Sequence, residues 1–200
     1  MKTFLHVGCG PQNESKIKGF NNDNWKEIRL DINKDVNPDI EGTLTDMKLV
    51  KTVRVDAVYS SHNIEHIYPH EVPIALKEFY RVLKEDGIVV ITCPDLQSVC
   101  EAVAQDKLLE PLYESPAGPI SPIDIIYGYR KDLAKGNEYM AHKGGFTYSS
   151  LNTSFFEAGF KARYGGRVKQ GGEYNLFLVA FKQKIPEEEI KKIANPFFPS

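Results

Sequence analysis

The fold is decided by the run GIVVITC at residues 87–93, a continuous stretch of mostly apolar and β-branched residues. A strand with this pattern is buried on both faces, as strands in parallel sheets are. Just before it, residues 71–85 place large apolar side chains on one stripe of a predicted helix, which we expect Asp86 and Gly87 to end. A buried strand directly after an amphipathic helix predicts an α/β fold.

On either side of this run, short β-rich segments alternate with helical stretches. Six further strands are expected, at residues 4–7, 27–32, 40–44, 53–60, 160–164 and 174–182. A glycine-rich turn joins the last two, so they should be antiparallel. Further helices are expected at residues 123–133, at residues 147–158 and after Pro186. The alternation predicts a parallel sheet wrapped by helices.

The chain is expected to form a single domain over residues 1–183, followed by a tail at 184–200. Four prolines between Pro111 and Pro122 interrupt the alternation. We therefore expect residues 106–146 to form an ordered excursion instead of part of the core. Two exposed phenylalanines at a terminus would be unusual, so Phe197 and Phe198 should dock on this protomer or on a partner.

Composition excludes several classes of protein. The chain has 200 residues, 42% of them hydrophobic, and a net charge of -2. It is long enough to bury a core of its own, and it lacks the excess of basic residues that a dedicated nucleic-acid-binding protein has. Its apolar runs are shorter than the roughly 20 residues of a membrane helix. The N-terminal residues do not read as a signal peptide, and the three cysteines form no CxxC pair, so we expect a reduced cytoplasmic domain without nucleic-acid or membrane partners.

Residues suited to ligand binding follow one strand after another. In an open parallel sheet, ligands bind beyond the carboxyl ends of the strands. These residues are Gly8, Cys9, Gly10, Asp31, Asp46, Ser60, Ser61, His62 and Asp95. Two glycines let the backbone approach a ligand closely, and an acid after the next strand can accept from both hydroxyls of a ribose. For the glycine pair alone, a tight turn beside a surface acid explains the residues equally well.

As a set, these motifs resemble those of the class I S-adenosylmethionine-dependent methyltransferases. The matching segments are residues 5–10, 31–32, 44–47, 61–67 and 81–87, and the resemblance spans about residues 3–183. It implies a three-layer Rossmann-like fold, with a mostly parallel seven-stranded sheet and an antiparallel last strand. It also implies methyl transfer from S-adenosylmethionine to a small-molecule or sugar-like acceptor, by O- or N-methylation.

More narrowly, three segments are similar to a small bacterial group with an SHxLEHI motif. These segments are SHNIEHI at 61–67, PD at 94–95 and HKGGFT at 142–147. Members of that group are generally taken to act in surface-glycan or secondary metabolism. In them the Glu-His pair, here Glu65 and His66, is a structural element of the turn.

The resemblance assigns a role in cofactor binding to nine residues. They are Gly8, Cys9, Gly10, Asp31, Ile32, Asp46, Met47, Ser60 and Ser61. The glycine turn would line the carboxypropyl and ribose part of the cofactor, Asp31 would bind the ribose hydroxyls, and Ile32 would pack against adenine. Asp46 and the amide of Met47 would bind the edge of adenine. The two serines would face the methionine end and the reacting methyl.

The chain departs from the family pattern at two positions. Family members usually carry an acid where His6 stands, to attract the ammonium group of the cofactor, and often a third glycine where Gln12 stands. We expect His6 to be a satisfied core histidine, so that either another carboxylate substitutes for the acid or the cofactor binds more weakly. The upstream helix that caps the cofactor in the family is not found before the first strand, so the excursion or a second protomer of a homodimer would form the lid.

Two histidines are candidates for the base that removes a proton from the acceptor. His142 lies in the later loop and is preferred over His62, which follows the fourth strand. Enzymes of this fold can also act by alignment alone. The aromatic stretch 110–148 is expected to shape the acceptor pocket. Its tyrosines are Tyr113, Tyr127, Tyr129 and Tyr139.

Three other functions are compatible with some of these motifs. A nicotinamide dinucleotide is disfavoured, because Asn13 stands at the third glycine position of that fingerprint and no good helix follows it. Residues 62–66 match the H-x-x-E-H motif of zinc hydrolases, but His62 follows a strand directly, so we expect no metal site. The main alternative is a methyltransferase fold that binds cofactor as a catalytically silent partner protein.

Overall fold

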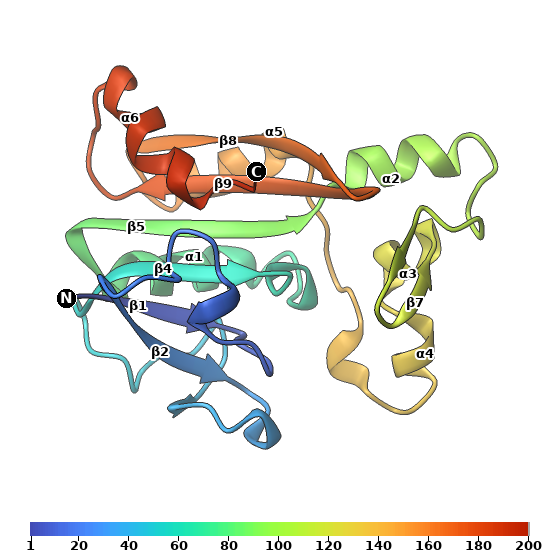
Figure 1. The fold of residues 1–200 in the computed structure, drawn as a ribbon, viewed down its shortest axis with the longest axis horizontal. Coiled ribbons are helices and arrows are strands. Elements are labelled where there is room, and N and C mark those ends of the chain that lie inside the picture. The colour runs from blue at the N-terminus through green and yellow to red at the C-terminus, as the bar shows by residue number, and fades with distance from the viewer. Residues whose placement is uncertain (200) are drawn as a thin grey trace.

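The computed structural model describes residues 1–199, except for the side chain of Gln170. Seven strands form one sheet in the order β3-β2-β1-β4-β5-β9-β8 (Figure 1). The strands are β1 Lys2–Val7, β2 Trp25–Asp31, β3 Ile40–Glu41, β4 Val55–Ser61, β5 Leu83–Pro94, β8 Ala162–Gln170 and β9 Glu173–Phe181. Strands β1 to β5 pair in parallel, and β9 runs antiparallel to both β5 and β8. The predicted sheet with its antiparallel last strand is confirmed.

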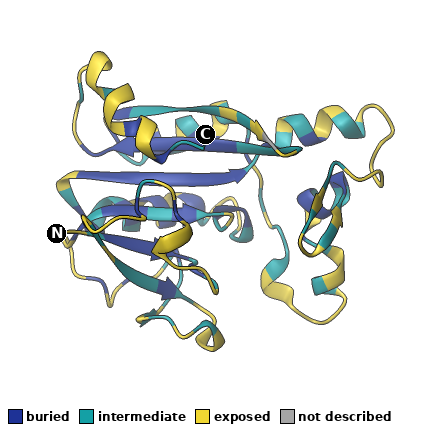
Figure 2. Ribbon diagram, in the orientation of Figure 1, coloured by how far each residue is buried: buried dark blue, intermediate teal, exposed yellow. Residues whose placement is uncertain are grey.

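Two layers cover the sheet, one on each face. Helices α1 (Val72–Val82) and α5 (Tyr148–Glu157) bury their apolar stripes against one face. The other face is covered by Ile17 and Phe20, which follow the 3-10 turn η1 (Glu14–Lys16), and by the C-terminal α6 (Glu187–Ala194) and η5 (Asn195–Phe197). Figure 2 shows the sheet as the buried centre between them. This is the three-layer Rossmann-like arrangement that the sequence predicts, and residues 11–25 hold no long helix, also as predicted.

The end of α1 differs from the prediction. The helix stops at Val82, and Leu83 already has extended backbone as the first residue of β5. The free carbonyls at its end are satisfied by the loop before β4, since the amides of Val53 and Arg54 donate to the carbonyls of Arg81 and Val82. A glycine cap is therefore not needed, and Gly87 lies within the strand instead.

A helix that the sequence analysis missed follows β5. Helix α2 (Leu96–Val103) begins at Asp95, whose Oδ1 accepts from the amide of Gln97 at 3.2 Å. The other carboxylate oxygen of Asp95 accepts from Arg167 Nε at 2.6 Å. Because this cap and ion pair use both oxygens, Asp95 stabilises the fold, and its pairing with a residue of β8 was not visible in the sequence.

The excursion forms a small unit beside the carboxyl ends of the parallel strands (Figure 1). It contains the hairpin of β6 (Tyr113–Ser115) and β7 (Gly118–Ile120), helices α3 (Pro122–Tyr127) and α4 (Arg130–Leu133), and the 3-10 turn η4 (Glu138–Met140). The single helix predicted at 123–133 is broken at Gly128, which has a φ of 101° and packs directly against the carbonyl of Met140. None of the helices within residues 1–199 is long and apolar enough to cross a membrane.

The tail docks on its own protomer, as predicted. The ring of Phe197 packs on Phe20 with 4.9 Å between centroids, and Phe198 packs on Phe177 at 4.4 Å. Only 8% of Phe197 is exposed, because it fills the space above Gly19 and Phe20. The tail thus completes the core on the face that lacks long helices.

Replacing Phe197 with alanine should lower the free energy of unfolding by about 3 kcal/mol, the usual cost of removing a buried phenylalanine ring. Urea denaturation followed by circular dichroism measures this change. The Phe156→Ala variant is a matched control, since Phe156 is 64% exposed on α5. Equal effects of the two substitutions would show that the tail adds nothing to the core.

Candidate cofactor site and histidine cluster

The glycine turn after β1 lies at the carboxyl edge of the sheet. Gly8 and Gly10 both have positive φ values, 67° and 52°. A side chain at Gly8 would collide with Asn63, whereas the space beside Gly10 is open. Asn63 Nδ2 is buried there and has no hydrogen-bond partner among the residues that the structure describes. An anionic group entering the turn would supply an acceptor for it.

Asp31, at the end of β2, is held beside this turn. Its Oδ2 accepts from the amide of Gly10 at 2.8 Å, and its Oδ1 accepts from the amide of Asn33 at 2.8 Å. Each carboxylate oxygen keeps a lone pair for another donor. The next residue, Ile32, is 46% exposed, which leaves an apolar surface beside the acid. An open glycine backbone, an oriented acid and an exposed apolar side chain together fit a nucleoside with its ribose on Asp31.

The expected adenine-binding pair is placed differently. Asp46 is exposed and pairs with Lys48 at 2.8 Å, and the Lys48 ammonium lowers the pKa of its carboxyl group. Met47 is buried, and its amide donates to Glu78 Oε2 of α1 at 3.0 Å. The Met47 amide is thus already bound to α1, and Asp46 lines a surface hollow together with Lys77 and Arg81 of α1. The backbone next to Asp31 is that of Gly42, whose amide donates to the Asp31 carbonyl at 3.0 Å.

The remaining cofactor candidates differ in accessibility. Cys9 is buried, and burial raises the pKa of its thiol to about 11, so the thiol is protonated and unreactive at neutral pH. Ser60 is fully buried, and its hydroxyl has no hydrogen-bond partner in the described part of the chain. Ser61 is partly exposed and lines a cavity of about 240 Å³ together with His62 and Thr92. Of the two serines, only Ser61 faces open space.

His6 is the satisfied core histidine that the sequence predicts. Its Nδ1 lies 2.7 Å from Glu27 Oε1, and both side chains are buried. Burial would raise the pKa of Glu27, but hydrogen bonds from His6 and Glu14 outweigh it and leave that pKa below its ordinary value. A carboxylate charge therefore lies next to His6, although His6 itself carries no negative charge.

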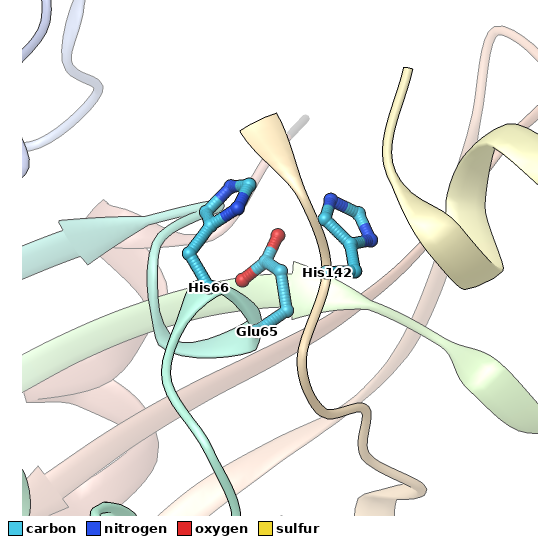
Figure 3. A group of neighbouring side chains, drawn as sticks. All are labelled: Glu65, His66 and His142. Atoms are coloured by element: carbon cyan, nitrogen blue, oxygen red, sulfur yellow. The ribbon is translucent and has the colours of Figure 1, made fainter. Parts of the chain in front are cut away.

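A second group of polar residues gathers where β4 ends. His62 follows the strand with a φ of 48°, and the 3-10 turn η3 (Ile64–His66) comes next. His62 and His66 therefore do not share the long helix that an H-x-x-E-H zinc hydrolase requires. Figure 3 shows Glu65 and His66 pointing toward His142, which arrives from the end of the excursion. The loop around His142 is fastened to η3, because the amides of Lys143 and Gly144 both donate to the Glu65 carbonyl, at 2.8 and 3.1 Å.

The charges in this group are set by burial and by one another. Burial lowers the pKa of His142, so its imidazole is neutral at pH 7. Burial alone would raise the pKa of Glu65, but the neighbouring His62 and His66 outweigh it and hold that pKa below its ordinary value. Burial would likewise lower the pKa of His62, yet the Glu65 carboxylate, 3.5 Å from His62 Nδ1, raises it.

These residues line a cavity of about 220 Å³ between the sheet edge and the excursion. Its wall includes His62, Glu65, His66 and His142, together with three tyrosines. Of the tyrosines expected in the acceptor pocket, Tyr113 and Tyr129 line this cavity, whereas Tyr127 and Tyr139 are more than 60% exposed. Tyr174 of β9 was missed, because the sequence does not show that β9 approaches the excursion.

Comparison with known proteins agrees with this geometry. Residues 5–91 match the family described as the methyltransferase domain. No curated protein matches the chain. Among solved structures, a methyltransferase from Methanosarcina mazei that depends on S-adenosylmethionine has a TM-score of 0.58 at 15% identity, with 92% of this chain and 93% of that chain covered. The chain has the fold of these enzymes.

Two further structures are similar. One is the 1,6-didemethyltoxoflavin-N1-methyltransferase of Burkholderia thailandensis, solved with 1,6-didemethyltoxoflavin and S-adenosylhomocysteine. It has a TM-score of 0.58 at 15% identity, with 92% of this chain and 72% of that chain covered. The other is a methyltransferase from Archaeoglobus fulgidus that depends on S-adenosylmethionine. It has a TM-score of 0.56 at 16% identity, with 90% of this chain and 86% of that chain covered.

Residues 5–91, somewhat less than half of the chain, are thus similar to the methyltransferase-domain family, and the sheet topology of the chain is that of solved S-adenosylmethionine-dependent methyltransferases. Those structures belong to enzymes that depend on S-adenosylmethionine, and the turn at Gly10 with Asp31 and Ile32 fits a nucleoside of that kind.

Proposed function

We propose that the protein transfers a methyl group from S-adenosylmethionine to a small or sugar-like acceptor held in the cavity beside the excursion. One observation carries the proposal: His62 lines both the cavity that contains Ser61 and the cavity that contains His142. The two spaces therefore adjoin at the end of β4, where the methionine end of the cofactor is expected. The size of the second cavity, about 220 Å³, suits a small molecule.

Each part of the chain has a distinct task in this proposal. Asp31 binds the ribose hydroxyls, Ile32 packs against adenine, and the glycine turn carries the part between ribose and methionine. Bound S-adenosylmethionine supplies a methyl group on a sulfonium, which leaves S-adenosylhomocysteine after transfer. The excursion covers the acceptor, and this cover excludes water from the reaction. The contacts of the excursion also hold the acceptor so that its attacking atom is aligned with the methyl group.

The acceptor loses a proton when its oxygen or nitrogen gains the methyl group. His142 is our first candidate to receive it. Its Nδ1 lies 2.6 Å from the Ile125 carbonyl, so Nδ1 carries the ring proton and Nε2 keeps a free lone pair. His62 is the second candidate, although its raised pKa leaves less of it neutral.

We also propose that the chain is one of the small bacterial enzymes with the SHxLEHI motif and that it acts in the cytoplasm. In support, the three segments of that resemblance meet in space. Residues of SHNIEHI, Pro94 and His142 line one cavity, and Asp95 pairs with Phe146 across a β-bridge. Cys9, Cys93 and Cys100 are all free thiols, as expected in a reducing compartment.

Isothermal titration calorimetry with S-adenosylmethionine and S-adenosylhomocysteine tests the cofactor site. We expect saturable heats for both ligands, because the ribose and adenine contacts are the same for the two. Heats equal to those of dilution at millimolar ligand would remove the proposal. Assays of S-adenosylhomocysteine release with panels of hydroxyl and amine acceptors then separate an enzyme from a silent partner, which would bind cofactor but turn over none of them.

A further inference from the structure

Three potential metal ligands meet at the wall of the acceptor cavity. One carboxylate oxygen of Glu65 and one ring nitrogen each of His66 and His142 all lie within 4.8 Å of one another. Figure 3 shows the Glu65 carboxylate between the two imidazole rings. The rings are 4.8 Å apart between centroids and nearly perpendicular. Two imidazoles and a carboxylate form the ligand set of many catalytic zinc sites.

Glu65 lacks the partners that a buried carboxylate needs. Its side chain is 2% exposed, and neither carboxylate oxygen has a hydrogen-bond partner within the described residues. His62 Nδ1 approaches Oε1 only to 3.5 Å. Burying an ionised carboxylate is costly unless a cation or hydrogen-bond donors compensate it. A cation between Glu65 and the imidazoles would supply that compensation.

Both histidines of the cluster are oriented as metal-binding histidines usually are. His66 Nδ1 lies 3.1 Å from the Ala141 carbonyl, and His142 Nδ1 lies 2.6 Å from the Ile125 carbonyl. A bond from Nδ1–H to a carbonyl leaves Nε2 deprotonated and fixes the plane of the ring, which prepares Nε2 to bind a metal.

The backbone holds the ligands together without an ion. Besides the two bonds that fasten residues 143 and 144 to Glu65, the amide of His142 donates to the Tyr127 carbonyl at 3.1 Å. Ligand atoms around a tetrahedral zinc ion lie about 3.3 Å apart, given bonds of about 2.0–2.1 Å. Binding therefore requires the widest spacing in the cluster to contract by at most about 1.5 Å, a distance that side-chain adjustment covers.

We propose that Glu65, His66 and His142 bind one divalent transition-metal ion, with Zn²⁺ preferred by ligand type, and leave a coordination position open to the acceptor cavity. This set differs from the H-x-x-E-H interpretation, which would use His62 and His66. It also replaces our expectation from sequence that no metal binds.

The consequence for catalysis rests on the proposed function. A divalent ion at this place would coordinate an acceptor hydroxyl and lower its pKa, so that the oxygen attacks the methyl as an alkoxide. His142 would then act as a ligand of the ion instead of as the base. The hydroxyl proton would pass to His62, whose side chain is 44% exposed at the cavity mouth.

The test is metal binding by the full chain without cofactor or acceptor. Protein dialysed against a chelator is titrated with zinc chloride against a competing indicator, and with cobalt chloride while the visible absorption of Co²⁺ is recorded. We expect one ion per chain, bound at micromolar zinc, and the intense absorption of four-coordinate Co²⁺. The Glu65→Gln and His142→Ala variants should each bind zinc at least about 10–100-fold more weakly, as loss of even an outer-shell partner typically does.

His70→Ala is the matched control. His70 is exposed and stacks on Tyr68 outside the cluster, so its loss should leave zinc affinity unchanged. Thermal unfolding gives a second readout, because an ion that binds the folded state raises the melting temperature. Zinc should raise it for the wild type and for His70→Ala but not for His142→Ala.

Failure of this inference is distinguishable from failure of the proposed function. A wild-type protein that binds S-adenosylhomocysteine but neither binds zinc nor gains thermal stability from it would overturn the metal site alone. Zinc binding that persists at full affinity in both ligand variants would also overturn it. Zinc binding without any cofactor binding would support the metal site and remove the methyltransferase proposal.

Discussion

His142→Ala is expected to lower the rate of methyl transfer by about 10²–10⁴-fold, the usual contribution of a positioned acid–base group. The affinity for S-adenosylhomocysteine should stay the same. The physical reason is that His142 lines the acceptor cavity, and its Nδ1 is bonded to the Ile125 carbonyl, which leaves the lone pair of Nε2 free. No other residue of the excursion places a free imidazole nitrogen in that cavity within the described chain.

Two measurements are needed to interpret this variant. Single-turnover rates give the chemical step, and calorimetry with S-adenosylhomocysteine shows whether the cofactor site is intact. His70→Ala is again the control, because it removes an exposed imidazole near the same turn. A His142→Ala variant with wild-type turnover would remove His142 from the chemistry, both as a base and as a metal ligand.

Asp31→Ala is expected to weaken the binding of S-adenosylhomocysteine by about 1.5–3 kcal/mol, the usual contribution of hydrogen bonds to a charged group. This corresponds to about 10–150-fold in the dissociation constant. The carboxylate already accepts from the amides of Gly10 and Asn33, which orient it toward the glycine turn. Its remaining lone pairs are those that two ribose hydroxyls would use.

Asp31 also supports the local backbone, so its replacement needs a control for folding. Asp31→Asn keeps one carbonyl acceptor and should recover part of the affinity. Asp35→Ala removes an exposed acid from the neighbouring 3-10 turn η2 (Lys34–Val36) and should leave binding unchanged. If Asp31→Ala binds S-adenosylhomocysteine as tightly as the wild type while remaining folded, the ribose does not lie on this carboxylate.

The architecture was largely predictable because its signals are local. A continuous apolar run such as residues 87–93 is characteristic of a strand buried on both faces, and Thr147 marks the start of α5 by a side chain that accepts from the amide of Ser150. Errors occurred where distant segments take over local roles. The last carbonyls of α1 accept from the amides of Val53 and Arg54. The acid that caps α2, Asp95, also forms an ion pair with Arg167 of β8.

The candidate cofactor site was predictable in part. Gly10, Asp31 and Ile32 lie together as expected, because the ends of neighbouring parallel strands meet at one edge of the sheet. Asp46 and Met47 do not join them, since the Met47 amide donates to Glu78 of α1 and the Asp46 carboxylate pairs with Lys48. The direction of a side chain in an irregular loop depends on the partners it finds in space.

The sequence by itself determined where the strands lie along the chain, the antiparallel end of the sheet and the residues at its carboxyl edge. Hydrophobic periodicity and turn residues act over a few positions and can be read from the chain alone. Only the tertiary structure decided that His142 meets Glu65 and His66, residues more than seventy positions earlier. That meeting depends on backbone hydrogen bonds between two loops, and such bonds leave no pattern in the sequence because every residue type except proline can donate them.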